Sequence, residues 1–192
     1  MNFDDTVKFH GHACPGLAIG YRVATFALKE LGLRARDEEL VAIVENNSCA
    51  VDAIQFICGC TFGKGNLIFK DFGKHVYTFI RRPHSEALRI AVKWEPPADD
   101  PETEAMWKRY SEGDRSPEVS TVVQDRKTRR MKDVLEKAAS ELFDVKRIIP
   151  EMPEPARIFQ SIVCSSCGEK VMETRTRDVG GKVVCIPCAE KS

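Results

Sequence analysis

The sequence lacks a net charge, because its 29 lysines and arginines equal its 29 aspartates and glutamates in number. This balance removes the strongest argument for a protein that binds nucleic acid or another polyanion. The chain also lacks an apolar run close to the roughly 18 residues of a membrane span. Its first residues, MNFDDTVKFHGH, do not resemble a signal peptide. We therefore expect a cytoplasmic protein with no membrane association.

Histidine is scarce, with four residues in the chain, whereas cysteine is plentiful, with eight. Disulfides are rare in cytoplasmic proteins, so these cysteines are expected to be metal ligands or redox groups. A chain of 192 residues with 43% hydrophobic content can bury one core and has some length to spare. The composition thus predicts one main domain with a small appendage.

The spacing of apolar residues predicts two helices in the first third of the chain. One covers residues 15–31, where apolar side chains recur at helical spacing and Gly32 follows as a stop. The other covers residues 49–58 and carries one apolar stripe. A further helical region is expected over residues 102–143, with an interruption at 113–117.

Short segments that are β-branched or alternate between apolar and polar residues predict the strands. These segments cover residues 40–46, 67–72, 75–82, 87–94 and 145–150. Short links join the predicted strands 67–72, 75–82 and 87–94, and one of these links contains Gly73. Such short links favour antiparallel neighbours. Together the elements predict an α+β fold in which helices flank a mixed, largely antiparallel sheet.

Three prolines in the segment PEMPEP predict a stiff, extended linker over residues 150–156 that belongs to neither fold. The linker separates an α+β core domain, residues 1–149, from a C-terminal domain, residues 157–192. The C-terminal domain is too short to bury an adequate core by itself. Its folding therefore needs another source of stability.

Two Cys-x-x-Cys pairs, Cys164 with Cys167 and Cys185 with Cys188, enclose 17 residues in the C-terminal domain. This spacing is typical of a zinc ribbon, in which four thiolates surround one ion. The residues between the pairs predict two strands joined by a Gly-Gly turn. We expect a structural zinc with no catalytic role, and a rubredoxin-like iron site is the alternative.

The stretch FHGHACPGLAIG places His10, His12 and Cys14 at alternate positions before Pro15. In an extended segment these three side chains would lie on one face. Proline disfavours helix in the residue before it, so Cys14 is predicted to be the last extended residue before a helix, where the dipole favours a thiolate. This geometry suits a metal or a reactive thiol. The alternative is that a Cys-Pro-Gly turn caps a core helix and the histidines only pack.

Cys49 repeats the placement of Cys14, because it follows a strand and opens a helix, and Asp52 lies one turn further on the same face. Cys60 lies in the loop at the far end of that helix. We hypothesise that a second transition metal, zinc, nickel or iron, binds in this core pocket. Its candidate ligands are His10, His12, Cys14 and Cys60, and the candidate catalytic residues are Cys14, Cys49 and Asp52. The alternative is a set of buried, inert thiols.

The segments FHGHACPGLAIGYR, SCAVDAIQ, GCTFGKGNL and DFGK, followed by CSSC and CIPC, resemble the FmdE family. This family is named for one subunit of the formylmethanofuran dehydrogenase complex of methanogens, and relatives occur in many anaerobes. The resemblance implies an α+β core, a homodimer that can exchange its ribbons, and a His/Cys metal cluster. By position, it points to His10, His12, Cys14, Cys49, Asp52 and Cys60.

The resemblance implies an accessory or regulatory metalloprotein associated with a molybdenum- or tungsten-dependent oxidoreductase. The subunits of that oxidoreductase complex would be its partners. Nothing in the chain resembles a pterin-binding module or the cysteine arrays of iron–sulfur subunits, so we do not expect it to reduce carbon dioxide alone.

Two other classes of function stay open. The chain could be a stand-alone enzyme that uses a pocket metal as Lewis acid, or Cys14 as nucleophile, on a small molecule. It could also be a nucleic-acid-binding regulator that acts through its ribbon. The ribbon has little charge for that role, with six Lys/Arg against four Asp/Glu from Ala156 onward, so nucleic acid is not the expected partner.

Overall fold

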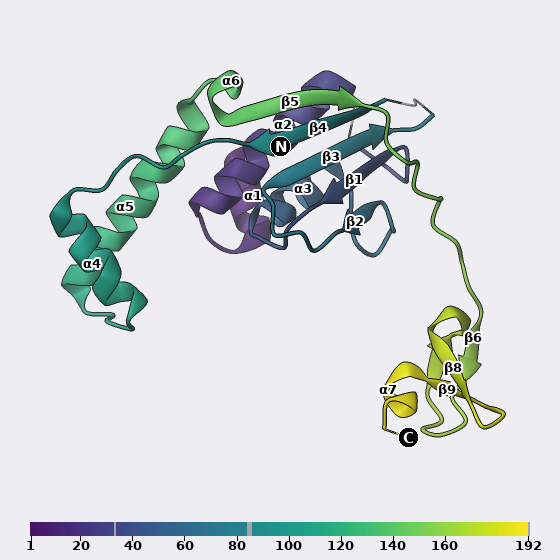
Figure 1. Cartoon of the computed structure of the whole chain (residues 1–192). Helices are drawn as coiled ribbons and strands as arrows, with labels where there is room; N and C mark the ends of the chain where they lie inside the picture. The colour runs from purple at the N-terminus through teal and green to yellow at the C-terminus, as the bar shows by residue number, and fades with distance from the viewer. Residues whose placement is uncertain (33, 84–85, 192) are drawn as a thin grey trace. The chain divides into compact units, whose positions relative to one another are not determined.

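The structure is a computed structural model that describes residues 1–32, 34–83 and 86–191. The chain forms two compact units, Met1–Pro155 and Ala156–Ser192 (Figure 1). Among the described residues, no helix combines the length and the apolar character that crossing a membrane requires.

A mixed sheet of five strands lies at the centre of the first unit, in the order β2-β1-β3-β4-β5 (Figure 1). The strands are β1 (Leu40–Val44), β2 (Leu67–Phe69), β3 (Val76–Arg81), β4 (Ala87–Val92) and β5 (Phe143–Ile148). β2 is parallel to β1, and the other neighbours are antiparallel. The predicted α+β class with a largely antiparallel sheet is confirmed.

One predicted pairing is wrong, because the link that contains Gly73 does not join neighbouring strands. β1 lies between β2 and β3 and pairs with both, so that Ala42 is opposite Leu67 on one side and Phe79 on the other. Every residue of β1 is buried. A continuously apolar strand is most stable in the centre of a sheet, where both faces are covered, and this long-range preference outweighs the short link.

Two helices, α2 (Pro15–Leu31) and α3 (Ala50–Cys58), lie against one face of the sheet, and α1 (Phe3–His10) packs against both of them (Figure 1). The boundaries of α2 agree with the prediction, and Gly32 follows as its C-cap. The side chains of β1, β3 and β4 that point toward these helices form the main core with them. This core includes Leu40, Ala42, Val44, Tyr77, Phe79, Leu88 and Ile90.

The expected helical region after β4 consists of α4 (Pro101–Ser111), α5 (Pro117–Glu136) and α6 (Ala139–Leu142). The break between α4 and α5 contains Gly113, whose φ of 104° favours glycine, and Pro117 begins α5. α4 and α5 form an antiparallel pair, and α5 also contacts α2.

The second unit consists of two small hairpins and a short helix. β6 (Ser161–Val163) pairs with β7 (Lys170–Met172), and β8 (Thr176–Val179) pairs with β9 (Lys182–Cys185). A 3-10 turn (Glu173–Arg175) and α7 (Ile186–Ala189) complete the unit. The predicted Gly-Gly turn joins β8 to β9, and both glycines have a positive φ.

Candidate metal centres

The four cysteines of the second unit form one group, here called the ribbon cluster. Cys164, Cys167, Cys185 and Cys188 each offer a sulfur atom, and these atoms lie within 4.8 Å of one another. The Cys185 backbone N–H donates to the Cys164 sulfur at 3.2 Å. Backbone N–H groups, first that of Cys167 and then that of Cys185, lower the pKa of Cys164 to about 6. These two N–H groups therefore favour a thiolate at Cys164.

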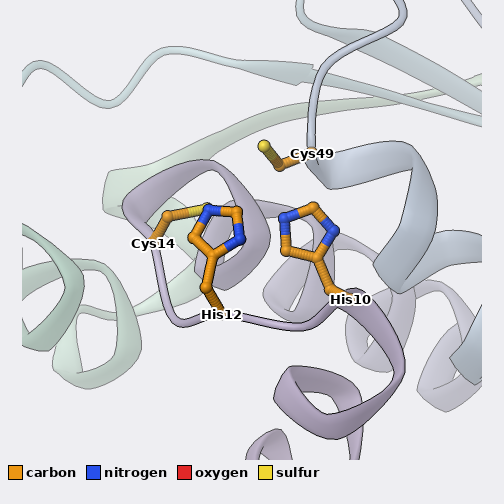
Figure 2. A group of neighbouring side chains, drawn as sticks. All are labelled: His10, His12, Cys14 and Cys49. Atoms are coloured by element: carbon orange, nitrogen blue, oxygen red, sulfur yellow. The ribbon is translucent and has the colours of Figure 1, made fainter.

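A second group in the first unit consists of His10, His12, Cys14 and Cys49, here called the core cluster. Their ligand atoms also lie within 4.8 Å of one another. Figure 2 shows the four side chains pointing toward one another. They come from the last residue of α1, the link to α2, and the residues that precede α2 and α3. Three of them are half-buried and His12 is exposed.

His10 reaches this place through a helix that the sequence analysis did not anticipate. Asn2 and Asp5 form a capping box that starts α1, and Gly11, with a φ of 97°, ends it. His10 therefore lies in a helix, and the expectation of an extended segment from His10 to Cys14 is wrong at its first residue. The turn at Gly11 brings the rings of His10 and His12 to a centroid distance of 4.5 Å.

Cys14 has the predicted position, extended and directly before Pro15. Its sulfur accepts a hydrogen bond from the Leu17 backbone N–H at 3.3 Å, as an N-cap side chain does. Cys49 also directly precedes a helix, α3, but its backbone is helical instead of extended and its side chain forms no cap bond. Burial first, and then the neighbouring Cys14, raise the pKa of Cys49. A bound cation would instead lower the pKa of Cys49, because a cation stabilises a thiolate.

Two glycines explain why Cys14 and Cys49 meet. Gly16 and Gly20 lie one turn apart on α2 and face the start of α3. A Cβ on Gly20 would overlap the backbone of Ala50, and a Cβ on Gly16 would lie 3.4 Å from the Cβ of Cys49. The helices can approach this closely only because both residues lack a side chain. The four-residue spacing of these glycines in PGLAIG was the sequence signal for this crossing.

Asp52 fixes the orientation of His10. The Nδ1 of His10 lies 2.7 Å from Oδ2 of Asp52, and the His10 side chain is 10% exposed. If Nδ1 carries the proton and donates it to the carboxylate, Nε2 keeps a free lone pair. This Nε2 atom is buried and has no hydrogen-bond partner among the described residues. A metal ligand with a carboxylate behind it has this arrangement, so the residues fit a metal.

Cys60 lies outside the core cluster, and Cys49 occupies the position in the cluster that was expected for Cys60. The Cys60 side chain is fully buried and donates its S–H to the Leu40 carbonyl at 3.3 Å. Burial raises the pKa of Cys60 to about 12. α3 has nine residues, a length of about 13 Å. Cys49 and Cys60 flank its opposite ends, so α3 cannot bring both to one ion.

A family model described as "FmdE, Molybdenum formylmethanofuran dehydrogenase operon" matches residues 9–144. A model described as "Prokaryotic dksA/traR C4-type zinc finger" matches residues 157–192. The latter supports a structural zinc in the ribbon cluster.

A curated relative from Archaeoglobus fulgidus, named "Probable S-adenosyl-L-methionine-binding protein", is 30% identical, and the alignment covers 95% of this chain and 50% of the relative. This chain thus spans half the length of that relative. A solved structure from Syntrophus aciditrophicus, described as a "tungsten formylmethanofuran dehydrogenase subunit e (fmde)-like protein", superposes with a TM-score of 0.64 at 22% identity. That alignment covers 100% of this chain and 94% of the other, and it shows a shared fold.

Proposed function

This chain belongs to the FmdE family, and from that premise we propose that it is an accessory metalloprotein with two metal sites in each chain. One is the structural zinc of the ribbon cluster, and the other is a transition metal held by the core cluster. The observation that carries the second site is the buried, unpartnered Nε2 of His10, which belongs to a group of four donors within 4.8 Å.

The donor set of the core cluster is two imidazoles and two thiols. This set suits zinc, and it also suits nickel or iron. A metal bound by all four donors would connect the ends of α1, α2 and α3 and would have no open position. This supports a structural, regulatory or metal-handling role over that of a stand-alone enzyme. Cys14 and Cys49 would then be ligands, with Asp52 supporting His10.

Metal content per chain tests the two sites. Full-length protein purified without air should contain two metal ions, and elemental analysis identifies them. Cys14→Ser should remove one ion and Cys185→Ser the other. Cys58→Ala is the matched control, because Cys58 is buried and lies outside both clusters. A wild-type chain with one ion, lost only with Cys185→Ser, would refute the core site.

We also propose that the protein acts in association with a molybdenum- or tungsten-dependent oxidoreductase. The family description and the ribbon, a module that often contacts other proteins, support this role. Anaerobic affinity purification of the tagged chain from its native organism should recover oxidoreductase or maturation subunits. A Cys185→Ser variant should recover fewer of them. Recovery of neither class of subunit would contradict the association.

The homodimer with exchanged ribbons is part of the same proposal. Light scattering on the full-length chain measures its mass, and a monomer at micromolar concentration would refute the dimer. S-adenosyl-L-methionine binding is left out of the proposal. The Archaeoglobus relative is twice as long as the matched region, and its name does not say which half binds that molecule.

A further inference from the structure

On the face of the five-stranded sheet that points away from α2 and α3, no helix of the described residues packs on the apolar cluster. Val41, Ile43, Ile80 and Ala87 form that cluster, with Ile68 and Ile148 at its border. The register places a polar residue and a charged residue beside it, because Ile43 is opposite Thr78 and Thr78 is opposite Arg89. Glu45 follows Ile43 two positions later on the same face.

A cavity of about 460 Å³ lies on this face. Ile43, Ile68 and Ile148 contribute apolar surface. The charged residues of the lining are two basic ones, Lys70 and Arg89, and three acidic ones, Glu45, Glu151 and Glu154. Residues 150–154 return along the cavity and complete its wall, and Arg82 donates to the Pro153 carbonyl at 2.7 Å. The first half of the proline-rich segment thus takes part in the first unit. The volume is within the range of small-molecule sites, about 300–1,000 Å³.

Glu45 and Arg89 form an unusual pair in this cavity. The Arg89 guanidinium lies 3.6 Å from the Glu45 carboxylate, which is too long for a hydrogen bond, and the two side chains are 32% and 12% exposed. Neither charged group forms a hydrogen bond with any other described residue. Replacement of both members of a poorly bonded, partly buried charge pair by apolar residues of similar volume is often neutral or stabilising, so the pair adds little to the stability of the fold. Its presence therefore points to a ligand.

We propose that this cavity binds a free aliphatic α-amino acid. The ammonium group would lie on Glu45, the carboxylate on Arg89 with Lys70 nearby, and the side chain on the three isoleucines. Such a molecule combines both charges with an apolar body, as the cavity does. Charge-assisted hydrogen bonds would satisfy the donors and acceptors that the protein leaves open. This inference does not depend on either metal site.

Calorimetric titration of the full-length protein with leucine tests the proposal. We expect saturable binding of one leucine per chain. 4-Methylpentanoate lacks the ammonium group and leucinol lacks the carboxylate, so each should bind at least about tenfold more weakly. Arg89→Met and Glu45→Gln should weaken leucine binding to the same extent. Arg147→Met is the matched control, because Arg147 pairs with Glu30 of α2 and lies on the opposite face of the sheet.

Thermal unfolding separates binding from folding. Because Arg89→Met alone would leave the buried Glu45 carboxylate without its partner, thermal unfolding uses the double variant Arg89→Met/Glu45→Gln, which should unfold at the wild-type temperature or higher. If it does not fold, Ile43→Phe keeps both charges, narrows the cavity and should also abolish leucine binding. Undetectable leucine binding by the wild-type protein, or unchanged binding by Arg89→Met, would overturn the proposal. So would a dimer that Arg89→Met dissociates, because the face would then be an interface between two copies of the chain.

Discussion

The Nδ1 atom of His10 is hydrogen-bonded to Asp52, while its Nε2 atom is buried without a partner among the described residues. Asp52 provides the hydrogen bond that selects between the two nitrogens. The replacement Asp52→Asn keeps the shape of the side chain and removes its charge. We expect it to lower the affinity of the core cluster for zinc by about 10–100-fold, because the imidazole becomes less basic and less fixed.

Competition with a chromophoric chelator under anaerobic conditions measures this affinity. Because the ribbon cluster is also a proposed zinc site, the two steps of the titration are assigned with Cys185→Ser as background. Asp125→Asn, at an exposed site on α5, is the control for the loss of one carboxylate. Equal affinities in the two variants would show that Asp52 does not support the site.

The sequence pattern predicted that His10, His12 and Cys14 meet, but it predicted Cys60 instead of Cys49 as the fourth member of the group. Cys49 and Cys60 both follow apolar segments, and the choice depends on how α3 is directed. That direction results from the contact of Ala50 with Gly20, which is 30 positions away in the sequence. Local patterns do not contain such a contact.

At the scale of the elements, the crossing of α2 and α3 determines where the core cluster forms. Gly20→Ala would place a methyl group in the backbone of Ala50, and neither helix can yield without moving Cys49 or Cys14. We expect a loss of about 1–3 kcal/mol in the free energy of unfolding, together with weaker metal binding at the core cluster.

Urea unfolding and metal content measure the two effects of Gly20→Ala. Gly63→Ala is a matched control, because Gly63 has open space around it and does not have a positive φ. The interpretation would be wrong if Gly20→Ala bound metal and unfolded as Gly63→Ala does.

Arg22 attaches the end of α5 to α2. Its guanidinium donates to the carbonyls of Val134, Leu135 and Lys137 at 2.6, 2.6 and 2.7 Å. These carbonyls lack partners inside the helix, because the last turn of any helix leaves its acceptors free. Arg22→Met keeps most of the apolar contact and should lower the free energy of unfolding by about 1.5–3 kcal/mol.

Urea unfolding of the core measures the Arg22 effect. Arg147→Met also removes one arginine that contacts another element, but its ion pair with Glu30 is exposed. Such pairs contribute about 0–1 kcal/mol, so this control should change stability little. A similar loss in the free energy of unfolding of both variants would show that Arg22 contributes no more to stability than an exposed ion pair does.

Helices and strands with strong local signals were predictable, whereas their pairing was not. Pro15 and Gly32 mark the ends of α2, so its boundaries follow from the sequence. The strand order depends on β1, which precedes β2 and β3 in the chain and yet lies between them in the sheet. The capping box of Asn2 and Asp5 is a local sequence signal for α1, although α1 was not among the predicted helices.

For the whole molecule, the two units obtain their stability from different sources. The first has a large apolar core on one face of its sheet. In the second, the buried side chains are Cys164, Val184 and Cys185, with Val171, Cys188 and Ala189 packed against them. Half of these six residues are the proposed zinc ligands. The proposed zinc would therefore replace a hydrophobic core in the ribbon, whereas the proposed metal of the core cluster would only supplement one in the first unit.

Removal of metal from the reduced, full-length protein should unfold one unit and spare the other. With a strong chelator, we expect the amide resonances of residues 156–191 to collapse to unfolded positions, while those of the five-stranded sheet keep their dispersion. Two-dimensional NMR on labelled protein measures both in one sample. Cys185→Ser should give the collapsed ribbon even with zinc present, and Cys58→Ala should keep it folded. A ribbon that stays folded without metal would show that its small apolar cluster suffices for folding. A sheet that unfolds together with the ribbon would show that the first unit depends on its own metal.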